Sequence, residues 1–251
     1  MNVKGWLTRH LFSGVQPKTI VFYPDGVEPR GFHGKNAFAD QLNLIGQGAQ
    51  IIFDIGANVG QTVEKYLQLF PFATIHCFEP FPASYQSLTT KNSDIRSVRC
   101  HLCAVSESDG EKSLHTFTNS VTNSLLPAST DVYRFVQAGQ MDDTGVIKVE
   151  SITIDTFCRQ ESIRAIDILK FDIQGGELNA LRGAAGMLSN QRVQLVYAEL
   201  LFVPVYQGQA DFHEVASYLS RHGYRLYDFY NFSYSERGQL RWGDAIFLPS
   251  R

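Results

Sequence analysis

The sequence has no hydrophobic run of the roughly 18 or more residues that a membrane-spanning helix needs, so we expect no stable membrane insertion. It also lacks a basic excess, because 22 Lys and Arg residues stand against 25 Asp and Glu residues. Without surplus cations to neutralise a phosphate backbone, nucleic acid is not expected as the main partner. Residues 1–10 contain no continuous apolar segment of signal-peptide length, so we expect a cytoplasmic protein.

Cysteine is scarce, with four residues in the chain. Cys100 and Cys103 have the spacing of a metal-binding pair, but no second pair follows at zinc-finger spacing. The surrounding run, residues 98–105, is typical of a strand, in which side chains three apart point to opposite faces. We therefore interpret these cysteines, together with Cys77 and Cys158, as buried structural side chains and predict no metal site.

Repeats and low-complexity tracts are also missing, and the content of 44% hydrophobic and 19% charged residues is that of a globular protein. Residues 1–45 are rich in Gly, Pro and aromatic residues with weak periodicity. We interpret them as an N-terminal appendage that packs beside the main domain, with a helix and a short strand. The main domain is expected over residues 46–251.

From Gln50 onward the pattern alternates between short apolar runs and helical periodicity. Repeated β-α units predict an α/β fold with a mostly parallel sheet and helices on both faces, which binds ligands at the carboxyl ends of its strands. The last two strands are joined only by a loop and can be antiparallel. Strands are expected over residues 51–55, 74–79, 98–105, 112–117, 166–173, 193–200, 224–230 and 245–248, and helices over residues 61–70, 82–92, 177–188 and 212–222.

The middle of the chain departs from this alternation. Asp109 and Gly110 form a hairpin signal, so residues 112–117 are expected to turn back as an extra strand. Residues 118–145 are polar and irregular. Because this segment is too long for a plain connection, it is a candidate functional loop or lid.

The first strand leads into a nucleotide-type loop. Gly56 allows a tight turn and Gly60 a close approach of helix and strand, while the helix that follows offers unpaired N–H groups. Asn58 stands where dinucleotide-binding loops have the glycine that approaches a pyrophosphate. Asp54, in front of the turn, favours a cationic ligand group over a phosphate.

Three acidic residues at strand ends, a lysine and one acidic residue at a helix start complete the candidate site. Glu79 ends the second strand about 20 residues after the loop, a position suited to bonding both hydroxyls of a ribose. Lys170 and Asp172 lie on one face of a central strand, and Glu177 follows in the first turn of the next helix. Glu199 ends the following strand and is expected to face the same cleft.

Three blocks of the sequence together resemble the FkbM family of S-adenosylmethionine-dependent methyltransferases. They are residues 53–60, residues 78–80 and residues 169–178, and the resemblance extends over about residues 50–248. The third block is the most specific, since it is similar to the family's K-x-D-x-x-G-x-E signature. Gly176 stands there where a small residue such as Ala is common.

The resemblance implies a Rossmann-like class I methyltransferase fold, with a mostly parallel seven-stranded sheet whose last strand is antiparallel. It implies that Asp54, Gly56, Asn58 and Gly60 surround the methionine part of S-adenosyl-L-methionine and that Glu79 holds the ribose. Residues near Ala104 would lie by the adenine. It further implies O-methylation of a hydroxyl on a small-molecule or glycan acceptor, such as a sugar or a polyketide.

A hydroxyl acceptor needs a base, and we hypothesise that Asp172 is that base or positions the acceptor, with Lys170 holding it ionised. Glu177 and Glu199 are secondary candidates. Mg²⁺ bound by Asp172, Glu199 and waters is an alternative, although the sequence shows no complete ligand set. His213, at a helix start, is interpreted as a surface or capping residue.

Two other functional classes stay open. A nicotinamide-dependent oxidoreductase would use the same fold, but Asn58, Asp54 and the signature block argue against it. A non-catalytic protein that keeps the cofactor pocket is the second alternative. DNA base methyltransferases usually carry a Pro-Pro-Tyr/Phe-type motif after the fourth strand, and this chain has residues 172–175 in its place.

Overall fold

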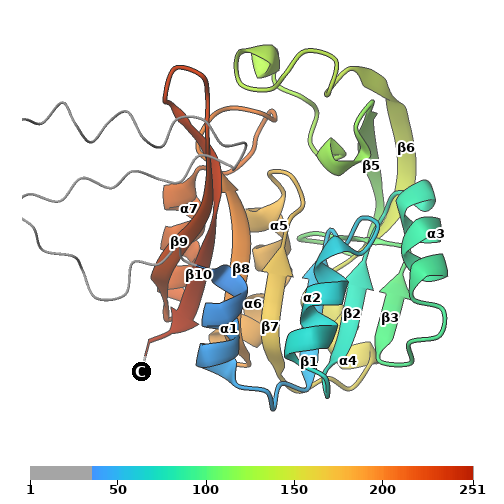
Figure 1. The fold of residues 1–251 in the computed structure, drawn as a ribbon, viewed down its shortest axis with the longest axis vertical. Helices are drawn as coiled ribbons and strands as arrows, with labels where there is room; N and C mark the ends of the chain where they lie inside the picture. The colour runs from blue at the N-terminus through green and yellow to red at the C-terminus, as the bar shows by residue number, and fades with distance from the viewer. Residues whose placement is uncertain (1–35, 251) are drawn as a thin grey trace, which may run out of the picture. The chain divides into compact units, whose positions relative to one another are not determined.

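The computed structural model describes residues 36–250 (Figure 1). The predicted appendage therefore falls mostly outside the described residues, and its boundary at residue 45 remains a prediction. The described chain begins with α1 (Ala37–Ile45), capped by the side chain of Asn36, which accepts hydrogen bonds from the backbone N–H groups of the first turn. Within residues 36–250, no helix has the length and apolar character to cross a bilayer.

The main sheet has seven strands in the order β3-β2-β1-β7-β8-β10-β9. All of its pairings are parallel except those of β10, which is antiparallel to both of its neighbours. This confirms the mostly parallel sheet with an antiparallel last strand. The strands are β1 (Ile51–Ile55), β2 (Thr74–Phe78), β3 (Val98–His101), β7 (Ile166–Phe171), β8 (Val193–Leu201), β9 (Tyr224–Tyr234) and β10 (Leu240–Pro249).

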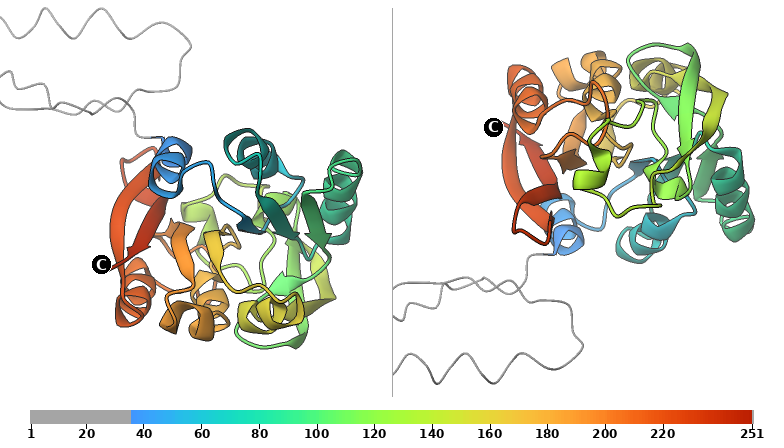
Figure 2. Two further views of the ribbon diagram at one scale, coloured as in Figure 1. Left: turned by 90° about the horizontal axis from the view of Figure 1, so that it is seen from below. Right: turned by 90° about the horizontal axis from the view of Figure 1, so that it is seen from above.

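Helices cover both faces of this sheet, as Figure 2 shows from below. One face carries α1, α2 (Gln61–Leu69) and α3 (Pro82–Lys91), and the other carries α4 (Ile154–Gln160), α5 (Glu177–Arg182), α6 (Ala185–Ser189) and α7 (Phe212–Arg221). Each face has its own buried apolar cluster, which explains why β1 and β7 are apolar on both sides. The helices leave the carboxyl ends of the parallel strands uncovered.

The expected third strand, residues 98–105, is wrong in one respect. The structure divides it into β3 and β4 (Ala104–Val105), and β4 leaves the main sheet. The reason lies in the register, since Phe78, the last residue of β2, pairs with His101, the last residue of β3. Beyond that point β3 has no neighbour, and β4 pairs instead with β6 (Asp143–Ile152), a strand that the sequence did not predict.

The hairpin expected at Asp109 and Gly110 is also wrong, although the extra strand exists as β5 (Gly110–Phe117). β5 pairs antiparallel with β6, which lies between β4 and β5 in a second sheet of order β4-β6-β5. Asp109 does not form a two-residue turn. Its carboxylate accepts hydrogen bonds from the backbone N–H of Thr153 and the hydroxyl of Thr156, at 2.6 and 2.8 Å, and so fixes the start of α4, which the sequence also missed.

The connection between β5 and β6 is the long polar segment singled out in the sequence. It contains two short 3₁₀ turns, η2 (Ser120–Thr122) and η3 (Val132–Arg134). The segment passes over the carboxyl ends of the strands of the main sheet (Figure 1). Its own small core joins it to the loop after β8. We call residues 118–142 the roof.

The helix expected over residues 177–188 is broken into α5 and α6 at Gly183. A Cβ at this position would lie 2.1 Å from the carbonyl oxygen of Ser106, so glycine lets two backbones meet there. Asp155 of α4 then accepts hydrogen bonds from the N–H groups of Gly186 and Met187, which starts α6. The contact between distant backbones, and not local propensity, ends α5.

A pair of histidines lies in the core beneath α4. His76 is only 1% exposed, and its Nδ1 lies 3.2 Å from Nε2 of His101, with Phe53 and Phe157 packed around the two rings. Burial, with the neighbouring His101 and Arg99, lowers the pKa of His76 from 6.5 to about 4. The folded protein therefore holds His76 neutral at a pH where the unfolded chain would protonate it.

We expect the stability of the fold to decrease as the pH drops from 6.5 to 4. In this pH range His76 binds a proton in the unfolded chain but stays neutral in the folded protein. The linked cost is at most about 3 kcal/mol. The free energy of unfolding in urea, measured at pH 7 and pH 4.5 for the wild type and for His76→Phe, checks this prediction. Between these two pH values the variant should lose less stability than the wild type. Equal losses would contradict the assignment.

Candidate active site

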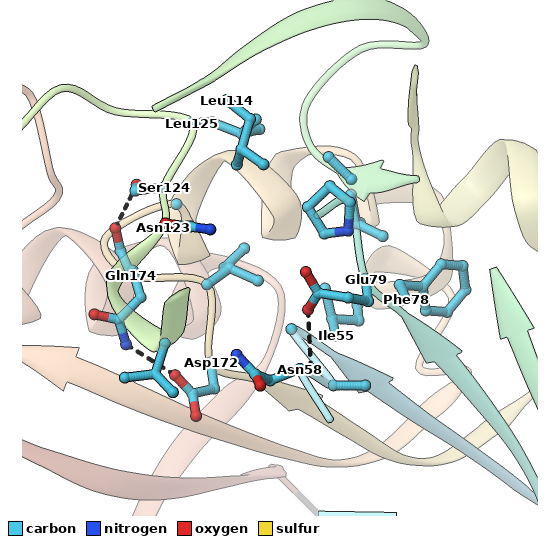
Figure 3. Close-up of a pocket in the computed structure, with 18 of the residues that line it drawn as sticks. Ile55, Asn58, Phe78, Glu79, Leu114, Asn123, Ser124, Leu125, Asp172 and Gln174 are labelled. Carbon is cyan, nitrogen blue, oxygen red and sulfur yellow. Dashed lines mark hydrogen bonds between the residues drawn. The ribbon is translucent and has the colours of Figure 1, made fainter. Parts of the chain in front are cut away.

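A cavity of about 260 Å³ lies at the carboxyl ends of β1, β2 and β7, below the roof (Figure 3). Its floor and sides come from the loops that follow the three strands, and its upper wall comes from β5 and the roof. Of the ten residues predicted for the site, six line it: Gly56, Asn58, Glu79, Ala104, Lys170 and Asp172. Asp54, Gly60, Glu177 and Glu199 do not.

The loop after β1 owes its shape to contacts inside the protein. Gly56 has φ +78°, and a Cβ there would lie 1.9 Å from the carbonyl oxygen of Asp172. Asn58 has φ +47°, and its side chain accepts a hydrogen bond from the N–H of Val59. Gly60, at φ +87°, begins α2 against Leu88 of α3 and takes no part in the cavity wall.

Glu79, 6% exposed, is held by the backbone at both oxygens. Oε2 accepts a hydrogen bond from the N–H of Asn58 at 2.9 Å, and Oε1 accepts one from the N–H of Phe81 at the same distance. Burial raises the pKa of Glu79, and these two backbone bonds oppose the shift. A carboxylate fixed in this way keeps further lone pairs for hydroxyl donors in the cavity.

Lys170 forms its closest ion pair with Asp54 and not with Asp172. Its Nζ lies 2.8 Å from Oδ1 of Asp54 and 3.8 Å from Oδ2 of Asp172, and the Asp54 side chain is fully buried. Burial alone would lower the pKa of Lys170, but the charges of Asp54 and Asp172 raise it above its ordinary value. Burial raises the pKa of Asp54, and Lys170 opposes this shift. The ion pair between Asp54 and Lys170 lies at the bottom of the site.

Asp172 is fixed by a residue that the sequence analysis missed. Gln174 Nε2 donates to Oδ1 of Asp172 at 3.0 Å and to Oε2 of Glu199 at 2.8 Å, so one amide links two of the predicted carboxylates (Figure 3 shows the first bond). The side chain of Asp172 remains 43% exposed. Burial, with the charges of Asp172 and Asp244, raises the pKa of Glu199 well above its ordinary value.

Glu177 serves the loop and not the cavity. It is 5% exposed, and its Oε1 accepts a hydrogen bond from the N–H of Ile173 at 3.1 Å. Burial raises its pKa to about 7, against the backbone bonds that it receives. The bond from Ile173 indicates that Glu177 holds the turn after β7 in place.

The upper wall of the cavity is mostly apolar. Leu114 of β5 and Leu125 of the roof pack with Ala104 of β4 in one small cluster. Cys103 also lines the cavity, and burial raises the pKa of its thiol to about 11, so it is neutral there. Cys77 and Cys158 are buried as expected, whereas Cys100 and Cys103 are only partly buried.

Asn123 and Ser124 of the roof also face the cavity, and the sequence carried no motif that marked them. Gln174 had one signal, its place before Gly175 and Gly176 in the signature block, and it adopts φ +56°. His213 is exposed beside Asp211, 3.9 Å away, on the first turn of α7, in agreement with the surface interpretation. Across residues 36–250, no cluster of three or more His, Cys, Asp or Glu side chains is placed to hold a metal ion.

Comparison with known proteins identifies this arrangement. The FkbM methyltransferase domain profile matches residues 54–226, which include all three motif blocks except Phe53. The 2-O-methyltransferase NoeI of Sinorhizobium fredii is 26% identical over 175 residues, 67% of this chain and 70% of that protein. The 31-O-demethyl-FK506 methyltransferase FkbM of Streptomyces tacrolimicus is 25% identical over 195 residues, 70% of this chain and 73% of its own.

Among solved structures, the 1,6-didemethyltoxoflavin-N1-methyltransferase of Burkholderia thailandensis, with bound S-adenosylhomocysteine, has 12% identity and a TM-score of 0.46. That match covers 85% of this chain and 76% of that one. The strand order of the main sheet, with its antiparallel β10, is that of the Rossmann-like class I methyltransferase fold. The profile match covers more than half of the sequence, and the chain belongs to the FkbM methyltransferase family.

Proposed function

We propose that this protein transfers a methyl group from S-adenosyl-L-methionine to a hydroxyl oxygen of a small-molecule or glycan acceptor. One observation carries the proposal: a single cavity brings together a backbone-anchored carboxylate, Glu79, and a half-exposed carboxylate, Asp172, beside a buried lysine. The first suits a pair of ribose hydroxyls and the second a hydroxyl that must lose a proton.

The residues present fit S-adenosyl-L-methionine. Glu79 retains free lone pairs for the ribose hydroxyls after it has accepted its two backbone bonds. The apolar wall at Ala104 and Leu114 suits the faces of an adenine. The carboxylate of Asp172 in the cavity wall favours a cationic ligand group. When bound, the cofactor supplies a methyl group already activated on a positively charged sulfur.

The remaining work falls to the residues of the chain itself. The roof and the loops after β1 and β7 exclude water and fix the direction from which an acceptor oxygen approaches. The carboxylate of Asp172 accepts the proton of the acceptor hydroxyl. Gln174 donates to Oδ1 of Asp172, and Oδ2, which lies 3.8 Å from Nζ of Lys170, would be the oxygen that accepts this proton.

Glu199 is the second candidate for the base, because Gln174 donates to it at 2.8 Å, against 3.0 Å for Asp172, and burial raises its pKa well above the ordinary value. Its position outside the cavity wall favours Asp172 for the direct contact. In the magnesium alternative, Asp172 and Glu199 would hold the ion together with waters. Undiminished turnover in excess chelator would count against it.

The names of the relatives support an oxygen acceptor. NoeI is named a 2-O-methyltransferase and the Streptomyces protein a methyltransferase of 31-O-demethyl-FK506. We therefore propose sugars and other hydroxyl-bearing natural products as the acceptor class. A screen of glycans, nucleotide sugars and polyketide alcohols with methyl-labelled S-adenosylmethionine tests it, and an intact cofactor site with no labelled product would favour the non-catalytic alternative.

Replacement of Glu79 by Gln is expected to weaken the binding of S-adenosylhomocysteine about 10- to 100-fold, because hydrogen bonds to a charged group are worth about 1.5–3 kcal/mol. Isothermal titration calorimetry measures the change. A matched control is Glu214→Gln, which alters the capping box of α7, away from the cavity. Unchanged affinity in Glu79→Gln, or selective binding of NAD by the wild type, would contradict the assignment.

Replacement of Asp172 by Asn is expected to lower kcat about 10²- to 10⁴-fold, because the amide cannot accept the proton of the acceptor hydroxyl. The affinity for S-adenosylhomocysteine should stay within a few-fold of the wild type. Glu199→Gln, measured in parallel, should have the smaller effect on kcat. Full turnover by Asp172→Asn on the true acceptor would remove Asp172 from the role of base.

A further inference from the structure

The roof contributes one polar side chain to the cavity whose hydrogen-bonding capacity is left unused. Oδ1 of Asn123 accepts a hydrogen bond from the N–H of Phe117 at 2.9 Å, which determines which end of the amide faces the protein. Nδ2, at the other end, is buried and has no hydrogen-bond partner among residues 36–250. Figure 3 shows this nitrogen directed into the cavity, on the side across from Glu79.

A buried amide nitrogen without a partner costs about 1–3 kcal/mol, so its presence in a cavity wall calls for a ligand atom. Because Oδ1 already accepts from Phe117, the group of Asn123 that lacks a partner is the Nδ2 donor. The ligand must therefore offer a hydrogen-bond acceptor at this point, such as a ring nitrogen or a carbonyl oxygen.

The surroundings of Asn123 narrow the choice. Its neighbour Ser124 has no donor left for a ligand, since its hydroxyl donates to the carbonyl of Gln174 at 2.7 Å, and it also accepts from the N–H of Leu126 at 3.0 Å. The other nearby side chains of the upper wall, Leu114 and Leu125, are apolar (Figure 3). A single hydrogen-bond donor, Nδ2 of Asn123, within an apolar wall is suited to a flat heterocycle that has acceptor nitrogens in its ring and apolar faces.

We propose that Asn123 recognises the adenine base of the methyl donor by donating a hydrogen bond from Nδ2 to a purine ring nitrogen. This inference rests on the proposed function and extends it, because it assigns base recognition to the roof and not to the loops of the main sheet. The roof then acts as part of the cofactor site, joined to the catalytic loop through the bond from Ser124 to Gln174.

Calorimetry with S-adenosylhomocysteine tests the proposal. Asn123→Ala should weaken binding about 5- to 30-fold, the equivalent of one buried hydrogen bond. Asn123→Asp, which keeps the acceptor for Phe117 but replaces the donor by an oxygen, should weaken it as well. The matched control is Asn119→Ala in the same roof, whose side chain accepts from the N–H of Val121 but lies outside the cavity wall; it should bind like the wild type.

Analogues of S-adenosylhomocysteine with C–H in place of N1, N3 or N7 identify the atom. One of the three should bind the wild type as weakly as Asn123→Ala binds the parent compound, with no further loss in the variant. If the wild type binds S-adenosylhomocysteine and Asn123→Ala binds it equally well, the role of Asn123 is refuted while the proposed function stands. The same holds if only the KM for the methyl acceptor rises. No binding by the wild type would refute the proposed function itself.

Discussion

The site depends on the buried ion pair between Asp54 and Lys170. A lysine inside a parallel sheet keeps its charge only where a carboxylate meets it, since an unpaired buried charge costs several kcal/mol. Asp54 of β1 and Lys170 of β7 are direct partners in the strand register, on the face that α1 and α2 cover. The pairing thus fixes how the two central strands align, and the chemistry of both loops follows from that alignment.

The consequences appear within the next two residues along each strand. The N–H of Asp172 donates to the carbonyl of Ile55 at 3.0 Å, and the Asp172 carbonyl comes so close to Gly56 that only glycine fits. The loop proposed to hold the cofactor and the carboxylate proposed as the general base are therefore in backbone contact. A shift in one moves the other, which explains why a glycine often interpreted as a cofactor contact is first a packing requirement.

The roof is tied to the same loop. Gln174 contacts Asp172 and Glu199 with its amide nitrogen, its backbone carbonyl receives the hydroxyl of Ser124, and its Oε1 lies 3.0 Å from the hydroxyl of Tyr206. Glu177 supports this turn from below. Asp172, the roof and the turn after β7 are therefore connected by one polar network. The orientation of Asp172 depends through Gln174 on the position of Ser124, which lies 50 residues before Gln174 in the chain.

The sequence by itself determined the elements whose signals are local. Apolar runs gave the central strands, the glycines of the first loop gave the turn, and two-residue spacing placed Lys170 and Asp172 on one face. Glu79 followed from its position at a strand end. The family signature then indicated the class of chemistry, because its residues are contiguous along the chain.

Only the tertiary structure decided which residues and strands contact one another. Lys170 meets Asp54 across 116 positions of sequence, β4 leaves the main sheet for β6, and α5 ends at Gly183 because the backbone of Ser106 meets it there. The direction of Nδ2 of Asn123 toward the cavity depends in the same way on the bond from Phe117. Periodicity and propensity describe a residue and its neighbours in the chain, whereas these features arise from hydrogen bonds and close contacts between segments that only folding brings together.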